Sequence, residues 1–177
     1  MNVAETSIPG VLRIELQVQP HDDGWFKENF HRGKLADLGM DVVQHNVAYF
    51  EEPGVLRGIH AEPWDKYLSP SSGRVFAAIV DLRDNETFGQ VETFELGPSD
   101  ALFVPRDVGN SFCTPTPHTT CNYLVNEPWS PARVAVNPLD PDLAIPWPAE
   151  DLKPVERDTS SPSLAQLRDD LQPPRAR

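Results

Sequence analysis

The sequence is poor in cysteine and in positive charge, and it has no long hydrophobic run. Its two cysteines, Cys113 and Cys121, lack the close spacing of a metal knuckle or a redox pair. The longest apolar runs fall far short of the roughly 20 residues that a membrane-spanning helix needs. With 15 Lys and Arg against 27 Asp and Glu, the formal net charge is -12. This charge excludes the broad basic patch by which proteins bind nucleic acids or anionic membranes.

The N-terminus also lacks the charged and then apolar segment that directs export. Together with the sparse cysteines, this absence predicts a protein of the reducing cytoplasm. The length of 177 residues suits one hydrophobic core. We therefore expect a single domain over residues 1–177, with neither nucleic acid nor membrane as a partner.

The middle of the chain alternates short apolar runs with turn residues, which predicts an all-β antiparallel sandwich. The number and spacing of these runs suit a jelly roll of the cupin-like kind. Residues 66–69 and 74–80 flank the turn-forming stretch 70–73, so we expect them to form a hairpin. Further strands are expected at residues 90–96, 101–104, 111–114, 120–125 and 133–137.

Helical signals are confined to two short peripheral stretches. These are residues 34–38 and residues 163–171, where leucines recur at helical spacing after Pro162. Residues 138–162 are rich in proline and aspartate, which indicates an ordered but irregular arm. The expected parts of the domain are an N-terminal segment (1–50), a core sandwich (51–137) and a C-terminal arm with a helix (138–177).

The most informative stretch for chemistry is residues 54–60, which contains Arg57 and His60 and is followed by Lys66. One base that titrates near neutral pH lies between two cations, a grouping that suits reactions of an anionic ligand. Strict alternation along a strand would place Arg57 and His60 on opposite faces. Both reach one pocket only if the strand is bulged, and Gly58 is the natural position for the bulge.

A lone histidine in an apolar run is more often a packed residue, and in a jelly roll it can instead bind metal. Metal-dependent cupins share a His-x-His pair, a following Glu and a distant fourth His. This chain has Ala61 between His60 and Glu62 but no second His, and Asn110 occupies the distant position. Because amide oxygens bind transition metals poorly, we predict no catalytic metal.

These motifs resemble those of the dTDP-4-dehydrorhamnose 3,5-epimerase family, which has an Arg-Gly-x-His segment and a downstream Lys in the same order. The similarity extends over most of the chain. It recurs at residues 24–28, 44–46, 80–83, 87–89 and 123–131 and at Asp158. The resemblance implies a cofactor-independent isomerase that acts on a nucleotide-linked 4-keto-6-deoxy sugar.

The resemblance also implies four catalytic roles. His60 corresponds to the base, Tyr123 to the acid on the opposite face, Asp158 to the carboxylate that orients the histidine, and Lys66 to the cation near the keto oxygen. Without the resemblance, the residue types indicate a core tyrosine at Tyr123, a turn cap at Asp158 and an exposed strand lysine at Lys66. Proton removal next to a carbonyl requires a base and a group that stabilises the enolate, and inversion also requires an opposed acid.

Ligand-binding positions follow from the same resemblance. Arg57, Gln44 and Asn46 match residues that hold the pyrophosphate and the sugar, and a guanidinium suits bidentate phosphate contacts. Phe26 and Glu28 match a segment that reaches into the neighbouring subunit to hold the nucleotide base, which implies a homodimer.

Three positions depart from the family pattern. Asp23 stands where the family usually has Arg, Asn110 where it has His, and Trp129 where it has a second Tyr near the sugar. Asn110 and Trp129 are still expected to contact the substrate. The nucleotide, the sugar and the number of inverted centres are therefore left open. The alternatives to inversion at C3 and C5 are a single-centre epimerase, a sugar 3,4-ketoisomerase and a non-catalytic sugar-nucleotide-binding protein.

Overall fold

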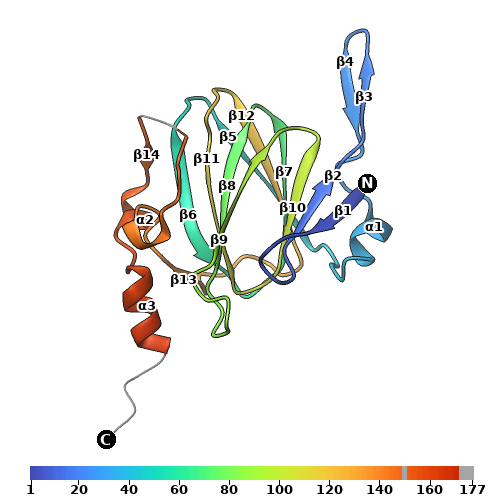
Figure 1. The fold of residues 1–177 in the computed structure, drawn as a ribbon. Helices are drawn as coiled ribbons and strands as arrows, with labels where there is room; N and C mark the ends of the chain where they lie inside the picture. The colour runs from blue at the N-terminus through green and yellow to red at the C-terminus, as the bar shows by residue number, and fades with distance from the viewer. Residues whose placement is uncertain (149–150, 172–177) are drawn as a thin grey trace, which may run out of the picture.

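The computed structural model describes residues 1–148 and 151–171, in which two β-sheets pack face to face (Figure 1). The first sheet contains, in spatial order, β1 (Asn2–Glu5), β2 (Leu12–Glu15), β10 (Asp100–Val104), β7 (Lys66–Ser72), β12 (Thr119–Val125) and β5 (Gln44–Phe50). The second contains β13 (Val134–Ala135), β6 (Val55–Ala61), β11 (Val108–Cys113), β8 (Val75–Asp81) and β9 (Val91–Leu96), with β14 (Lys153–Pro154) parallel to β6. This architecture confirms the expected antiparallel sandwich.

The core lies between the sheets because each sheet presents an apolar face to the other. Leu68 of β7 and Leu102 of β10 belong to one cluster with Ile79 of β8 and Leu96 of β9. None of these four side chains is more than 2% exposed. Burial of such a side chain contributes about 1.5–3 kcal/mol, so the core holds the strand backbones in fixed positions.

The expected hairpin between residues 66–69 and 74–80 is wrong. β7 pairs with β10 and β12 in the first sheet, whereas β8 pairs with β9 and β11 in the second. The turn, in which Gly73 has a φ of 68°, therefore carries the chain from one sheet to the other. Turn composition predicts a reversal of the chain. It does not decide whether the two strands pair side by side or face each other across the core.

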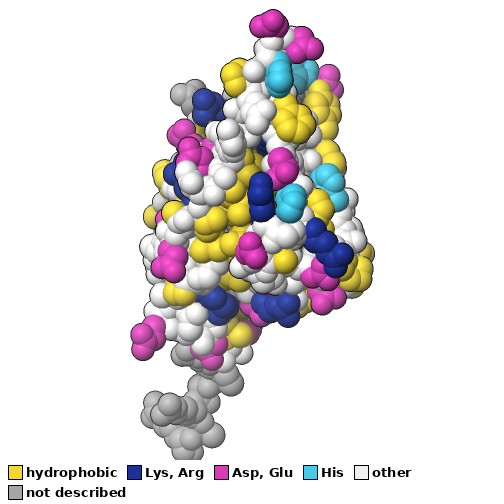
Figure 2. Space-filling view, turned by 90° about the vertical axis from the view of Figure 1, so that its right-hand side faces the viewer, with side chains coloured by type: hydrophobic (Ala, Val, Ile, Leu, Met, Phe, Trp, Pro, Cys, Tyr) yellow, Lys and Arg dark blue, Asp and Glu magenta, His cyan; other side chains and the backbone are white. Residues whose placement is uncertain are grey.

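The N-terminal segment extends beyond the sandwich as well as contributing β1, β2 and β5 to it. β3 (Val18–His21) and β4 (Gly24–Lys27) form a separate hairpin that projects from the body of the molecule (Figure 1). Trp25 and Phe26 on this hairpin are 45% and 58% exposed. Figure 2 shows the side of the molecule on which the hairpin lies, with hydrophobic side chains gathered below it and along one edge.

Both expected helices are present, with shifted ends. α1 (Arg32–Ala36) begins before residue 34 because His31 caps it and accepts a hydrogen bond from the Lys34 N–H. α3 (Leu164–Leu171) buries Leu164 and Leu167. No helix of the described residues is long and apolar enough to cross a membrane.

The C-terminal arm contains the short 3-10 helix η1 (Pro141–Leu143) and α2 (Glu156–Thr159), neither of which the sequence pattern indicated, besides β14 and α3. The arm returns along the outer edge of β6 (Figure 1). Its last residues, 172–177, lie outside the described part of the chain. The arm thus places α2, which contains Asp158, beside β6, which contains His60.

Candidate active site

A cavity of about 380 Å³ lies between the two sheets. Arg57 and His60 of β6 and Asn110 of β11 line it from the second sheet, and Asn46 of β5, Lys66 of β7 and Tyr123 of β12 line it from the first. Trp129 also lines it, and its side chain is 68% exposed. The fold thus brings together seven of the eleven residues singled out in the sequence.

A bulge in β6 turns Arg57 and His60 into this same cavity. Asn110 of β11 is opposite His60, and Phe112 is opposite Arg57. Between these two pairs β6 advances by three residues and β11 by two, so β6 contains one extra residue. Gly58 in the bulge has a φ of 99°. A Cβ there would lie 2.6 Å from the carbonyl oxygen of Asn110. The predicted bulge at Gly58 is confirmed, and glycine is needed there because a side chain has no space.

The expected pairing of His60 with Asp158 is also confirmed. The Nε2 atom of His60 is 2.8 Å from Oδ1 of Asp158, whose other oxygen accepts the Gly58 N–H at 3.0 Å. Asp158 comes from α2 and is 1% exposed. Burial alone would raise its pKa, but the hydrogen bonds from Gly58 and His60 hold that pKa below its usual value.

The state of the imidazole follows from these contacts. An ionised carboxylate only accepts hydrogen bonds, so Nε2 donates its proton and Nδ1 is left as the unprotonated nitrogen. Burial lowers the pKa of His60 below 6.5, although Asp158 opposes that shift. His60 is therefore neutral at pH 7, as a general base must be.

Lys66 is buried, in contrast to the exposed strand lysine that its residue type suggested. Its side chain is 8% exposed, and its Nζ atom donates to the carboxylate of Glu62 and to the side-chain oxygen of Asn110. It also lies 3.5 Å from the His60 carbonyl oxygen. Burial lowers the pKa of Lys66, while the charge of Glu62 and its hydrogen bond raise it.

Tyr123 lines the cavity from the sheet opposite His60. Its ring packs against that of Phe112, with 6.0 Å between the ring centroids. Burial, reinforced by the nearby Cys121, raises the pKa of the phenol well above 10. The hydroxyl therefore keeps its proton at neutral pH and is available as an acid.

Gln44 does not line the cavity but connects two residues that do. Its side-chain nitrogen donates to the side-chain oxygen of Asn46 at 2.7 Å, and its side-chain oxygen accepts the Trp129 N–H at 3.3 Å. Gln44 thus links β5 to the segment that follows β12. Gln44 thereby supports Asn46 and Trp129, and its expected contact with the substrate stays a prediction.

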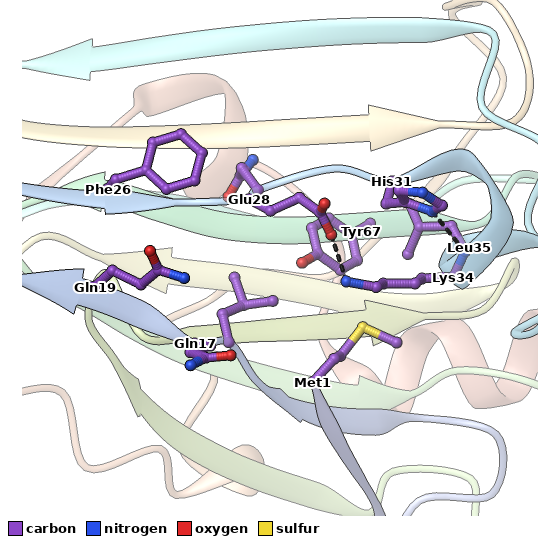
Figure 3. Close-up of a pocket in the computed structure, with 11 residues that line it drawn as sticks. Met1, Gln17, Gln19, Phe26, Glu28, His31, Lys34, Leu35 and Tyr67 are labelled. Atoms are coloured by element: carbon purple, nitrogen blue, oxygen red, sulfur yellow. Dashed lines mark hydrogen bonds and ion pairs between the residues drawn. The ribbon is translucent and has the colours of Figure 1, made fainter.

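Phe26 and Glu28 are not brought to His60 within one chain. They line a second cavity, of about 200 Å³, together with Gln19 and Lys34 (Figure 3). The carboxylate of Glu28 is turned toward Lys34, with 2.5 Å between Oε1 and Nζ (Figure 3). Any contact of Phe26 or Glu28 with the ligand of the His60 cavity would therefore come from another copy of the chain.

Glu62 is the cavity residue whose role the sequence analysis missed. It was weighed only as a metal ligand, although it lies two positions after His60 and four before Lys66, so alternation places it on the face of His60. That spacing was a usable signal. Among the described residues, no group of three or more His, Cys, Asp or Glu side chains is placed to hold a metal ion.

The fold and cavity define a jelly-roll isomerase with proton-handling groups on opposite walls. The profile of the dTDP-4-dehydrorhamnose 3,5-epimerase family matches residues 5–166, and the chain belongs to this family. It is therefore an epimerase of a nucleotide-linked 4-keto-6-deoxy sugar.

Individual relatives agree with this assignment. The RmlC homolog of Streptococcus pyogenes is 40% identical over 176 residues, which cover 91% of this chain and 88% of the relative. The dTDP-4-dehydro-6-deoxyglucose 3-epimerase of Streptomyces bikiniensis is 37% identical over 155 residues, which cover 80% of this chain and 76% of the relative. The structure of RmlC from Streptococcus suis in complex with dTDP-D-xylose is 37% identical, with a TM-score of 0.86 and 93% and 92% of the two chains covered.

Replacement of Gly58 by alanine should disrupt the site through the bulge. The new Cβ would meet the Asn110 carbonyl oxygen and would hold a positive φ, which costs about 1–3 kcal/mol. Urea unfolding should show this loss of stability, and epimerase activity should fall because Arg57 and His60 no longer share a face. Gly97→Ala is the matched control, because a Cβ there meets only the Asp100 carboxylate at 3.9 Å. Unchanged activity in Gly58→Ala would contradict the role of the bulge.

Proposed function

We propose that His60, Lys66, Tyr123 and Asp158 invert the configuration of C3, C5 or both in a dTDP-linked 4-keto-6-deoxy sugar. The observation that supports this proposal is that a neutral imidazole and a protonated phenol line one cavity from opposite sheets. A sugar ring bound between the two sheets would have the base on one face and the acid on the other. The relatives named for dTDP-sugars and the bound dTDP-D-xylose of the Streptococcus suis structure support dTDP as the nucleotide.

Proton transfer begins at Nδ1 of His60. This nitrogen removes the proton from the carbon next to the C4 ketone, and the electron pair of the broken C–H bond moves onto the keto oxygen as an enolate. The Lys66 ammonium stabilises the developing negative charge. Tyr123 then donates its proton to the same carbon from the opposite face, which inverts the centre. Solvent returns the proton from His60 to Tyr123, so the net reaction is an isomerisation that needs no redox cofactor.

Substrate binding uses the remaining cavity residues. Arg57 has its guanidinium carbon 6.0 Å from the centre of the Phe50 ring, a position from which it can bind the diphosphate. Asn46 and Asn110 offer amide groups to the sugar, and the exposed Trp129, which also lines the cavity, offers an aromatic surface. These contacts bind the ligand without a large positive patch, in keeping with the acidic charge of the chain.

The alternative outcomes differ in what Tyr123 must do. A sugar 3,4-ketoisomerase need only return a proton on an accessible face, and a binding protein needs neither an oriented base nor an opposed acid. The pairing of His60 with Asp158 and the facing Tyr123 therefore favour inversion over both. A single-centre epimerase retains all of these features. Relatives of both kinds, 3,5-epimerases and 3-epimerases, are similar to this chain.

We also propose a homodimer in which the β3–β4 hairpin of one copy completes the site of the other. Among the described residues β5 is an edge strand of the first sheet, and its residues Asn46 and Tyr49 line the His60 cavity, so the cavity lies beside a sheet edge. The Tyr49 side chain is 59% exposed, and Phe26 on the hairpin is 58% exposed. Contact between copies would cover both and would bring Phe26 and Glu28 to the nucleotide.

The cysteines support a reducing compartment. Cys113 and Cys121 are both free and buried in the core. Burial raises the pKa of the Cys113 thiol to about 11 and that of the Cys121 thiol to about 12, so both behave as small apolar side chains. We accordingly propose the cytoplasm, where such an enzyme would meet its nucleotide-sugar substrate.

Replacement of His60 by asparagine should remove the base. Exchange of the sugar C3 and C5 protons with deuterated solvent, followed by NMR on a dTDP-4-keto-6-deoxy sugar, should fall by about 10²–10⁴-fold. In the native protein, kcat/KM should rise with pH, because the base works unprotonated. The midpoint of that rise should lie below pH 6.5, because burial lowers the pKa of His60. His31→Asn is the matched control, since His31 is exposed, lies outside the His60 cavity and caps α1, and asparagine also caps helices. Exchange at the native rate in His60→Asn would exclude His60 as the base.

Replacement of Tyr123 by phenylalanine should separate exchange from inversion. His60 would still remove and return the proton, so deuterium should enter the substrate with its configuration retained. Inversion should fall by about 10²–10⁴-fold. Proton NMR distinguishes the two epimers, and Tyr67→Phe controls for loss of a buried hydroxyl outside the His60 cavity. Rapid inversion by Tyr123→Phe would show that another group supplies the proton.

Mixing inactive chains should test the shared site. His60→Asn chains combined with Phe26→Ala/Glu28→Ala chains should recover about a quarter of the native activity, because half of the dimers are mixed and each holds one complete site. A control mixture of His60→Asn and Tyr123→Phe chains should gain nothing, since both defects lie within one chain's cavity. Absence of recovery in the first mixture, with dimers confirmed by light scattering, would contradict exchange of the hairpin.

A further inference from the structure

We propose that Glu62 is a positioning residue that keeps Lys66 as an ammonium group at the keto oxygen of the substrate, an inference that rests on the proposed function. Glu62 follows the end of β6 and reaches across to Lys66 at the start of β7, so it joins the two sheets at the cavity. Its carboxylate contacts the Lys66 Nζ atom, and its side chain is 15% exposed. Both residues line the cavity that contains His60 and Tyr123.

A buried ammonium group needs a counter-charge, because the loss of hydration favours the neutral amine. The Lys66 Nζ atom donates to the Glu62 carboxylate, the Asn110 side-chain oxygen and the His60 carbonyl oxygen. The last two are neutral acceptors. Glu62 alone among these partners bears a negative charge, and it opposes the fall in the Lys66 pKa that burial causes.

The other charged and titratable groups around the cavity do not replace this charge. Among the described residues that line it, Glu62 is the one acidic side chain. Arg57 is a second cation, and His60 is neutral. Asp65, next to Lys66 in the chain, accepts the Arg106 N–H and an Asn126 side-chain N–H instead. The phenols of the cavity belong to Tyr49 and Tyr123.

The charge of the Glu62 carboxylate also favours one orientation of the substrate in the cavity. A diphosphate is repelled by Glu62 and attracted by Arg57, whereas a neutral keto sugar is not repelled by a carboxylate. The pair of Glu62 and Lys66 is close to neutral before the reaction. When negative charge develops on the keto oxygen, the ammonium is already in position and little reorganisation is needed.

Glu62→Gln tests the charge while it preserves the shape and an oxygen acceptor for Lys66. The kcat for solvent exchange should fall about tenfold to a hundredfold, with a smaller change in KM. The alkaline limb of the kcat profile should move to lower pH, because Lys66 loses its proton more readily without Glu62. Glu62→Asp should restore part of the rate, and Glu86→Gln, an exposed acidic site, should leave kcat and the pH profile unchanged.

A direct measurement separates this inference from the proposed function. Carbon-13 NMR of labelled lysine should report a lower pKa for Lys66 in Glu62→Gln than in the native chain, with Lys66→Gln used to assign the signal. The role of Glu62 is overturned if the Lys66 pKa, or the alkaline limb of the kcat profile, is the same in Glu62→Gln as in the native chain. The proposed function stays intact in that case, provided that His60→Asn is inactive. Full exchange in His60→Asn overturns the proposed function, whatever the pKa of Lys66.

Discussion

The structure of the site depends on one buried carboxylate. Asp158 accepts the Gly58 N–H with one oxygen and holds the His60 imidazole with the other, so the bulge and the base are fixed by the same group. The carboxylate stays ionised because Gly58, His60 and the Arg157 side chain all donate to it, which in turn decides which imidazole nitrogen is free. Asp158 itself belongs to the C-terminal arm. The arm therefore acts on the chemistry through α2, although it contributes little to the sheets.

Burial sets the protonation states that the reaction requires. The pKa of His60 is lowered and that of Tyr123 is raised by the same loss of solvent, so a neutral base and a protonated acid coexist at pH 7. Lys66 is the exception, since burial lowers its pKa and so disfavours the charged form that the reaction requires. Burial in the cavity thus sets the direction of the pKa shifts of His60 and Tyr123, with Asp158 opposing the shift of His60. Lys66 is paired with the carboxylate of Glu62.

Much of the fold and part of the site could be predicted from the sequence. Alternation of apolar residues indicated the sandwich, the leucine spacing indicated α3, and Gly58 between Arg57 and His60 indicated a bulge. The 66–80 hairpin was wrong because turn residues specify a reversal and not a pairing partner. The contacts of Gln44 with Asn46 and Trp129 could not be predicted, because Trp129 is more than eighty residues away in the chain. Glu62 was missed because it was weighed only as a metal ligand, although its spacing from His60 and Lys66 was a usable signal.

The amino-acid sequence by itself determined the class of fold, the family and the candidates for the reacting groups, since periodicity and local motifs are properties of neighbouring residues. Only the tertiary structure decided that His60 and Tyr123 share a cavity, that Asp158 meets His60 across 98 positions, and that Phe26 and Glu28 do not reach it within one chain. Those facts depend on how the two sheets pack, and packing joins residues that are far apart in the chain.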